Sequence, residues 1–108
     1  MDAQSDDALL FDVLTPLGFK VHCTEEYWQR KVIVDHPVMA DQIEGVKRAL
    51  IEPDEVRLSR TDDGVYLFYL SAEKRLVCSV ARKTDGDGFL ITAYPTDKMK
   101  EGKTVWRK

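Results

Sequence analysis

The fold is decided by residues 56–94, which read VRLSRTDDGVYLFYLSAEKRLVCSVARKTDGDGFLITAY. Four segments of this stretch are rich in β-branched and aromatic residues, which favour strands; they are Val56–Arg60, Val65–Leu70, Leu76–Arg82 and Phe89–Tyr94. The intervening Asp62-Asp63-Gly64 and Asp85-Gly86-Asp87-Gly88 are typical of tight turns. Consecutive strands joined by short turns predict an antiparallel meander.

Two helices are predicted before the meander. Thr24 is a good N-cap, and two acidic residues follow it where the helix dipole favours negative charge, so a first helix runs to about Val34. A second begins at His36-Pro37, because proline suits the first helical position. Its core-facing stripe consists of Met39, Ile43, Val46 and Leu50. We therefore expect an α+β fold, with two N-terminal helices packed on a four-stranded antiparallel sheet.

The rest of the chain adds an expected extra strand and two charged ends. Phe19–Cys23 alternates apolar and polar residues, which predicts an extra N-terminal strand. Residues 1–8 are predicted to be a flexible acidic lead, and residues 9–108 a single domain with a basic C-terminal segment. The lead has acid where a secretory signal needs positive charge, and no segment is long and apolar enough to span a membrane, so we expect a cytoplasmic protein.

Composition and motifs exclude several classes of function. A net charge of -3 argues against an avid, nonspecific nucleic-acid binder. Cys23 and Cys78 lie in strand-like segments, which favours buried, reduced thiols. His22 and His36 lie in different elements, so no zinc-like spacing exists and no metal is expected. No motif for a nucleotide cofactor is present, so no cofactor is expected either.

Four polar residues remain as a candidate catalytic site, and they are His36, Arg82, Thr92 and Tyr94. Cleavage of RNA without a metal needs a base for the 2'-hydroxyl proton, an acid for the leaving oxygen, and cations or donors for the charge that develops on phosphorus. These side chains are of the required types. If the last two strands pair through the turn at 84–88, Arg82 lies near the start of the last strand and must reach toward Thr92.

The basic C-terminal segment provides candidate substrate-binding residues, which are Lys98, Lys100 and Lys103. Its positive field is suited to guiding a polyanion, or an acidic protein partner, toward a nearby cleft. A solvated, solubilising tail is the alternative interpretation.

The order of helices and strands resembles the superfold shared by barnase, EndoU, colicin-type tRNases and RelE-type toxins, especially its small phage and prophage nucleases. The resemblance rests on His36-Pro37, on Pro53-Asp54-x-Val56, on Arg82 in a strand, and on Thr92-Ala93-Tyr94 followed by Thr96. It implies that His36 is the general acid or base, that Arg82 binds phosphate, and that Thr92 and Tyr94 are donors. It also implies a toxin-type endoribonuclease, with RNA as substrate and an antitoxin as a protein partner.

Each candidate residue also has a structural interpretation. His36 is equally suited to a helix boundary, Arg82 to an exposed strand end, and Thr92 and Tyr94 to strand positions without function. Two other function classes therefore stay open. One is a noncatalytic RNA- or protein-binding module of the same fold, and the other is a structural protein associated with a mobile element.

Overall fold

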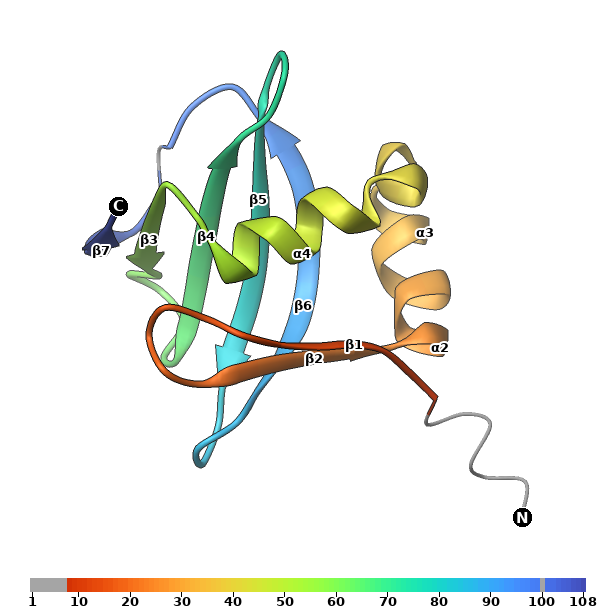
Figure 1. Cartoon of the computed structure of the whole chain (residues 1–108), viewed down its shortest axis with the longest axis horizontal. Coiled ribbons are helices and arrows are strands. Elements are labelled where there is room, and N and C mark those ends of the chain that lie inside the picture. The colour runs from red at the N-terminus through yellow and green to blue at the C-terminus, as the bar shows by residue number, and fades with distance from the viewer. Residues whose placement is uncertain (1–7, 100) are drawn as a thin grey trace.

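A seven-stranded sheet dominates the molecule (Figure 1). The computed structural model describes residues 8–99 and 101–108. In spatial order the strands are β1 (Leu9–Leu14), β2 (Lys20–Thr24), β6 (Gly88–Thr96), β5 (Leu76–Lys83), β4 (Val65–Ser71), β3 (Glu55–Leu58) and β7 (Lys103–Arg107). Neighbouring strands are antiparallel except β2 and β6, which run parallel through the pairs Val21–Gly88 and His22–Phe89. The sheet is therefore mixed.

The structure is α+β, but the predicted arrangement of two N-terminal helices on a four-stranded antiparallel sheet is wrong. The hairpin of β1 and β2 precedes both helical stretches, and β7 extends the sheet beyond β3. Only the middle of the sheet, from β3 to β6, is the meander that the sequence predicts. The extra N-terminal strand predicted at Phe19–Cys23 is confirmed as β2, which pairs with β1 in a hairpin. By contrast β7 depends on pairings between distant residues, such as Val56 with Trp106, which no local pattern reports.

The first helical stretch covers residues 25–35 and contains a π-helical turn. Thr24 caps it as predicted, since its hydroxyl accepts a hydrogen bond of 3.1 Å from the Tyr27 amide. Trp28 and Val32 are both buried on its inner side. The stretch consists of α2 (Glu25–Tyr27), the π-helical turn (Trp28–Val32) and α3 (Ile33–Asp35). Its backbone is thus less regular than one continuous α-helix.

The second helical stretch is divided in two. A 3₁₀ helix (Pro37–Asp41) is followed by α4 (Ile43–Ile51), and the break falls at Gln42, whose φ of -113° and ψ of 21° are not helical. The predicted start at Pro37 is confirmed. The predicted apolar stripe also faces the core: Met39, Val46 and Leu50 are at most 1% exposed, and Ile43 packs beside them.

The main core lies between α4 and one face of the sheet. In Figure 1, α4 crosses in front of β4 and β5, and the hairpin of β1 and β2 lies beside it. The buried Ser79 hydroxyl donates a hydrogen bond of 3.0 Å to the carbonyl oxygen of Val46, which joins β5 to α4. Because strand residues alternate between faces, a second apolar cluster forms on the other face from Val65, Leu67, Tyr69, Cys78 and Val80. The middle of the sheet is thus buried on both faces.

The two cysteines are packing residues of this core, as predicted. Cys23 is 2% exposed and Cys78 is fully buried, and both are free thiols. Burial raises the pKa of each thiol to about 12. Both side chains therefore stay protonated and are poor nucleophiles at neutral pH.

Candidate functional site

His36 lies where the free edge of β6 meets the helices. In the described sheet β2 leaves β6 after Phe89, and the first helical stretch lies along the edge that remains, with the Tyr27 hydroxyl donating a 2.6 Å hydrogen bond to the Ile91 carbonyl. His36 ends α3 and precedes Pro37, and its backbone is not helical. The structure thereby brings it against β6, where its ring centroid is 5.6 Å from that of Tyr94.

Tyr94 is the partner that the structure supplies for His36. The two rings are tilted by 43°, so the contact is between ring faces and edges and not a parallel stack. Tyr94 pairs across the sheet with Cys78. Burial, with a further contribution from the neighbouring Cys78, raises the pKa of the Tyr94 phenol above its usual range. The phenol therefore stays protonated and is suited to donating a hydrogen bond.

Arg82 does not join this pair. It lies opposite Phe89 at the start of β6, and its Nη1 donates a 2.8 Å hydrogen bond to the Asp63 carbonyl oxygen in the turn before β4. Tyr94 is opposite Cys78, four residues away along β5, which is about 13 Å of strand. The expected placement of Arg82 near the start of the strand is confirmed, and this position separates it from His36 and Tyr94.

Thr92 lies near Tyr94, but its hydroxyl is enclosed. The residue pairs with Val80, and its Oγ1 is buried without a hydrogen-bond partner among the described residues. A buried hydroxyl cannot donate directly to a ligand at the surface. Thr92 therefore acts in this structure as a strand residue next to Tyr94.

The three candidate lysines do not form one patch. Lys98 lines a shallow hollow of about 390 Å³ together with Tyr94, Thr96 and Glu101. Lys103 is at the start of β7, four strands away from β6 in the sheet order, or about 19 Å at the usual strand spacing. Lys100 lies outside the described residues. Of these residues, the structure therefore brings Lys98 to the His36–Tyr94 pair.

Arg75 was missed by the sequence analysis and lies near the same end of β6. It sits in the turn between β4 and β5, and its Nε is 3.2 Å from Asp97 Oδ1. Both side chains are more than half exposed, so this surface ion pair is weak and leaves the guanidinium available to a ligand. The signal that could have found Arg75 is its place in a hairpin turn: the predicted pairing of the last two strands puts that turn beside the end of β6.

A second hollow, of about 370 Å³, opens on the opposite side of this strand end. Its walls include Val38, two residues after His36, and Pro95, the residue after Tyr94. Met39 and Val77 add apolar surface, and Arg75 lies at its edge. The His36–Tyr94 pair therefore lies between two hollows, one mostly polar and one mostly apolar, and each has a basic residue in its lining.

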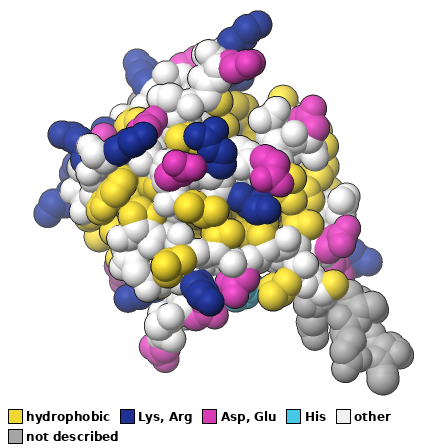
Figure 2. All heavy atoms as spheres, in the orientation of Figure 1, with side chains coloured by type: hydrophobic (Ala, Val, Ile, Leu, Met, Phe, Trp, Pro, Cys, Tyr) yellow, Lys and Arg dark blue, Asp and Glu magenta, His cyan; other side chains and the backbone are white. Residues whose placement is uncertain are grey.

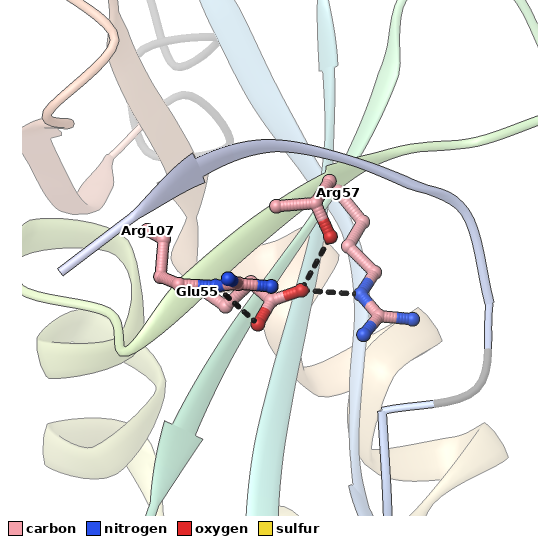
Figure 3. Close-up of polar contacts among 4 residues, drawn as sticks. Glu55, Arg57 and Arg107 are labelled. Atoms are coloured by element: carbon pink, nitrogen blue, oxygen red, sulfur yellow. Dashed lines mark hydrogen bonds and ion pairs between the residues drawn. The ribbon is translucent and has the colours of Figure 1, made fainter.

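A polar cluster around the buried Glu55 carboxylate lies elsewhere and is structural. Figure 3 shows the Glu55 carboxylate between Arg57 and Arg107, with Nε–O distances of 2.7 and 3.4 Å. Thr104 donates a further hydrogen bond of 2.6 Å to Glu55. These contacts lower the pKa of Glu55, the Thr104 hydrogen bond contributing most. The carboxylate of Glu55 already accepts hydrogen bonds from neighbours on β3 and β7. Glu55 therefore stabilises the pairing of the edge strand β7 with β3 and is not a site for a ligand.

His22, the other histidine, lies at the opposite end of β6. Its Nδ1 is 3.7 Å from Asp87 Oδ2, and its ring is near Phe89. It is therefore remote from His36 and offers an internal control for it.

The described part of the chain contains neither a metal-binding cluster nor a membrane-spanning helix. Residues 8–99 and 101–108 contain no group of three His, Cys, Asp or Glu side chains placed to hold a metal ion. None of the helices in those ranges has the length and apolarity required to cross a membrane. Comparison with known proteins finds no matching family, no matching curated protein and no matching solved structure.

Proposed function

We propose that the protein is a metal-independent endoribonuclease of toxin type, with its reaction centre at His36 and Tyr94. The observation that carries this function is the contact of the two rings, 5.6 Å between centroids, between hollows with basic residues in their linings. This contact supports a role for the His36 imidazole in proton transfer beside a phenol that can donate a hydrogen bond. The resemblance to the barnase, EndoU, colicin and RelE superfold belongs to the same proposal, with cytoplasmic RNA as substrate and an antitoxin as a partner.

The chemistry assigns a separate task to each group. The His36 imidazole takes the proton of a 2'-hydroxyl as that oxygen attacks the adjacent phosphorus and the bond from phosphorus to the 5'-oxygen breaks. The leaving 5'-oxygen takes a proton from water, and the imidazolium returns its own proton to the solvent. The products are a 2',3'-cyclic phosphate and a free 5'-hydroxyl. Tyr94, which stays protonated, donates a hydrogen bond to the phosphate. Arg75 and Lys98 offset the charge that develops on phosphorus, a task for which Arg82 lies too far away.

The test is cleavage of total RNA and of purified tRNA in EDTA by the full chain. His36→Ala should reduce the rate by about 100-fold or more, the usual contribution of a general acid or base. His22→Ala is the matched control, since it removes the histidine at the other end of β6, and should retain most of the activity. Mass spectrometry should find cyclic phosphate ends. An unchanged rate in His36→Ala would contradict a reaction centre at His36. Absence of RNA cleavage by the native chain would contradict the proposed enzymatic function.

A second function is favoured by the separation of Arg82 and by the enclosed Thr92 hydroxyl, which leave the set of catalytic groups incomplete. It is a noncatalytic module that binds RNA or an acidic protein through β7, a basic edge strand that exposes Lys103 and Arg107. Lys103→Glu should then weaken RNA binding measured by fluorescence anisotropy, and Lys20→Glu, a reversal on β2, should leave it unchanged. Equal binding by both variants would contradict a role for β7.

A further inference from the structure

The apolar hollow beside His36 has the composition of a ligand pocket. Its volume of about 370 Å³ falls in the range of small-molecule sites. Met39, Val77 and Pro95 form apolar walls, and the first two are at most 5% exposed, so the walls are part of the packed core. The hollow therefore offers apolar surface held in place by the packing of the core.

The polar groups around the hollow add specificity to this apolar surface. The Gln42 side chain lines it, and an amide can both donate to and accept from one edge of a ring. Within residues 8–99 and 101–108 the amide makes one long hydrogen bond, of 3.4 Å to the adjacent Asp41, which a ligand could replace. Lys74 and Arg75 lie in the β4–β5 turn and line the hollow together with the acidic Glu73, so the charged part of the lining is positive on balance. Figure 2 shows basic and acidic side chains at the end of the molecule where this turn lies, above an area of hydrophobic ones.

Apolar walls, an amide and cations together match one class of ligand, a nucleotide. A nucleobase has two apolar faces and a polar edge, and the phosphate that it carries is anionic. An acidic peptide would use the cations but would leave the apolar walls and the amide without a matching group. Two residues of its lining are close in the chain to the His36–Tyr94 pair: Val38 is two residues after His36, and Pro95 follows Tyr94.

We propose that this hollow is a nucleobase-binding subsite, which holds the base of a nucleotide whose phosphate lies toward Arg75 and His36. It rests on the proposed ribonuclease function for its biological role, and it gives that reaction a preference for particular bases. Binding of a nucleotide here does not itself require catalysis, so the two can be tested separately.

The test is a titration of the full ¹⁵N-labelled chain with adenosine 3'-monophosphate, with uridine 3'-monophosphate and with inorganic phosphate, followed by NMR. The nucleotides should shift amide signals of residues 38–42 and 72–77, and inorganic phosphate should leave those of Met39 and Val77 unchanged. Val38→Asp places a negative charge at the hollow and should weaken nucleotide binding about tenfold or more. Val34→Asp is the matched control, because Val34 is similarly exposed, at 66% against 61%, and lies outside the lining. It should change binding less than about twofold.

Five outcomes bear on the subsite. Equal weakening by the two variants, or shifts at residues 38–42 that inorganic phosphate also produces, would overturn it. If Val38→Asp does not fold by circular dichroism, Arg75→Ala replaces it, and unchanged nucleotide affinity in that variant overturns the subsite as well. Nucleotide binding at the hollow without any RNA cleavage would support the subsite and contradict the proposed ribonuclease function. RNA cleavage without changes in the amide signals at the hollow on nucleotide addition would support the ribonuclease function and contradict the subsite.

Discussion

At the scale of single residues, Glu55 makes the strongest stability prediction. Its buried carboxylate accepts hydrogen bonds from Arg57 and Thr104 and lies 3.4 Å from Arg107. Glu55→Gln keeps the shape but removes the charge that these donors face, so it should lower the free energy of unfolding by about 2 kcal/mol in urea denaturation. Glu52→Gln is the control, because Glu52 forms an exposed pair with Arg48, and should cost less than about 0.5 kcal/mol. Equal losses would show that the cluster does not stabilise β7.

The same cluster predicts a pH dependence. The pKa of Glu55 is lowered in the folded state, chiefly by the Thr104 hydrogen bond. Its stabilising effect is therefore complete above the unfolded-state pKa of about 4.3 and is lost as pH falls through the lower folded value. The stability difference between the native chain and Glu55→Gln should be constant from pH 7 to about 5.5 and decrease below about 4. A difference that stayed constant down to pH 3 would contradict this assignment.

Residue chemistry was easier to predict than residue proximity. His36 and Tyr94 were singled out by type, and their contact depends on the free edge of β6, which only the complete sheet reveals. Strand pairing did predict that Arg82 lies near the start of β6. It could not report that the Arg82 guanidinium binds the Asp63 carbonyl, since that contact depends on the shape of another turn.

At the scale of elements, β7 depends on the glycine that precedes it. Gly102 has a φ of +90°, and a Cβ there would lie 2.8 Å from the Leu58 carbonyl oxygen and 2.9 Å from Arg57 Cβ. Gly102→Ala should thus combine backbone strain with a clash against β3, for a loss of about 2 kcal/mol or more in thermal or urea unfolding. Gly18→Ala separates the two effects, because Gly18 has a similar φ of +96° and open space around its Cα. Its loss should be about 1 kcal/mol; a Gly102→Ala loss no larger than this would exclude the clash.

Elements with local signals were predicted, and elements without them were not. The Thr24 cap and Pro37 mark helix starts by their own chemistry, and both marks are found in the structure. By contrast β1 reads Leu-Leu-Phe-Asp-Val-Leu, which lacks the alternation of a half-buried strand, and β7 reads as a charged tail. β1 is a strand because the next segment of the chain, β2, pairs with it in a hairpin, and β7 is a strand because the distant β3 offers an edge. The break at Gln42 also lacks a local signal, because the apolar stripe continues through it from Met39 to Ile43.

At the scale of the whole molecule, the sheet joins two apolar clusters into one structure. Residues of β4 alternate between them, with Phe68 in the main core and Leu67 and Tyr69 in the second cluster. Loss of β4 or β5 would therefore expose both clusters at once. Trp106 of β7 also packs against the main core, as does Trp28 from the first helical stretch. This continuity predicts that residues 9–108 unfold cooperatively, as a single domain should.

The two tryptophans allow that cooperativity to be measured at opposite ends of the sheet. In Trp28→Phe the remaining fluorescence reports Trp106 and hence β7, and in Trp106→Phe it reports Trp28 and hence the helices. Trp28 is only 3% exposed, so its replacement should lower the midpoint of urea unfolding more than that of the partly buried Trp106. Within each variant, however, fluorescence and far-ultraviolet circular dichroism should give the same midpoint, because both probes follow one transition. An earlier fluorescence midpoint in Trp28→Phe alone would show that β7 detaches first, and the Glu55 cluster would then be the boundary between two separately stable units.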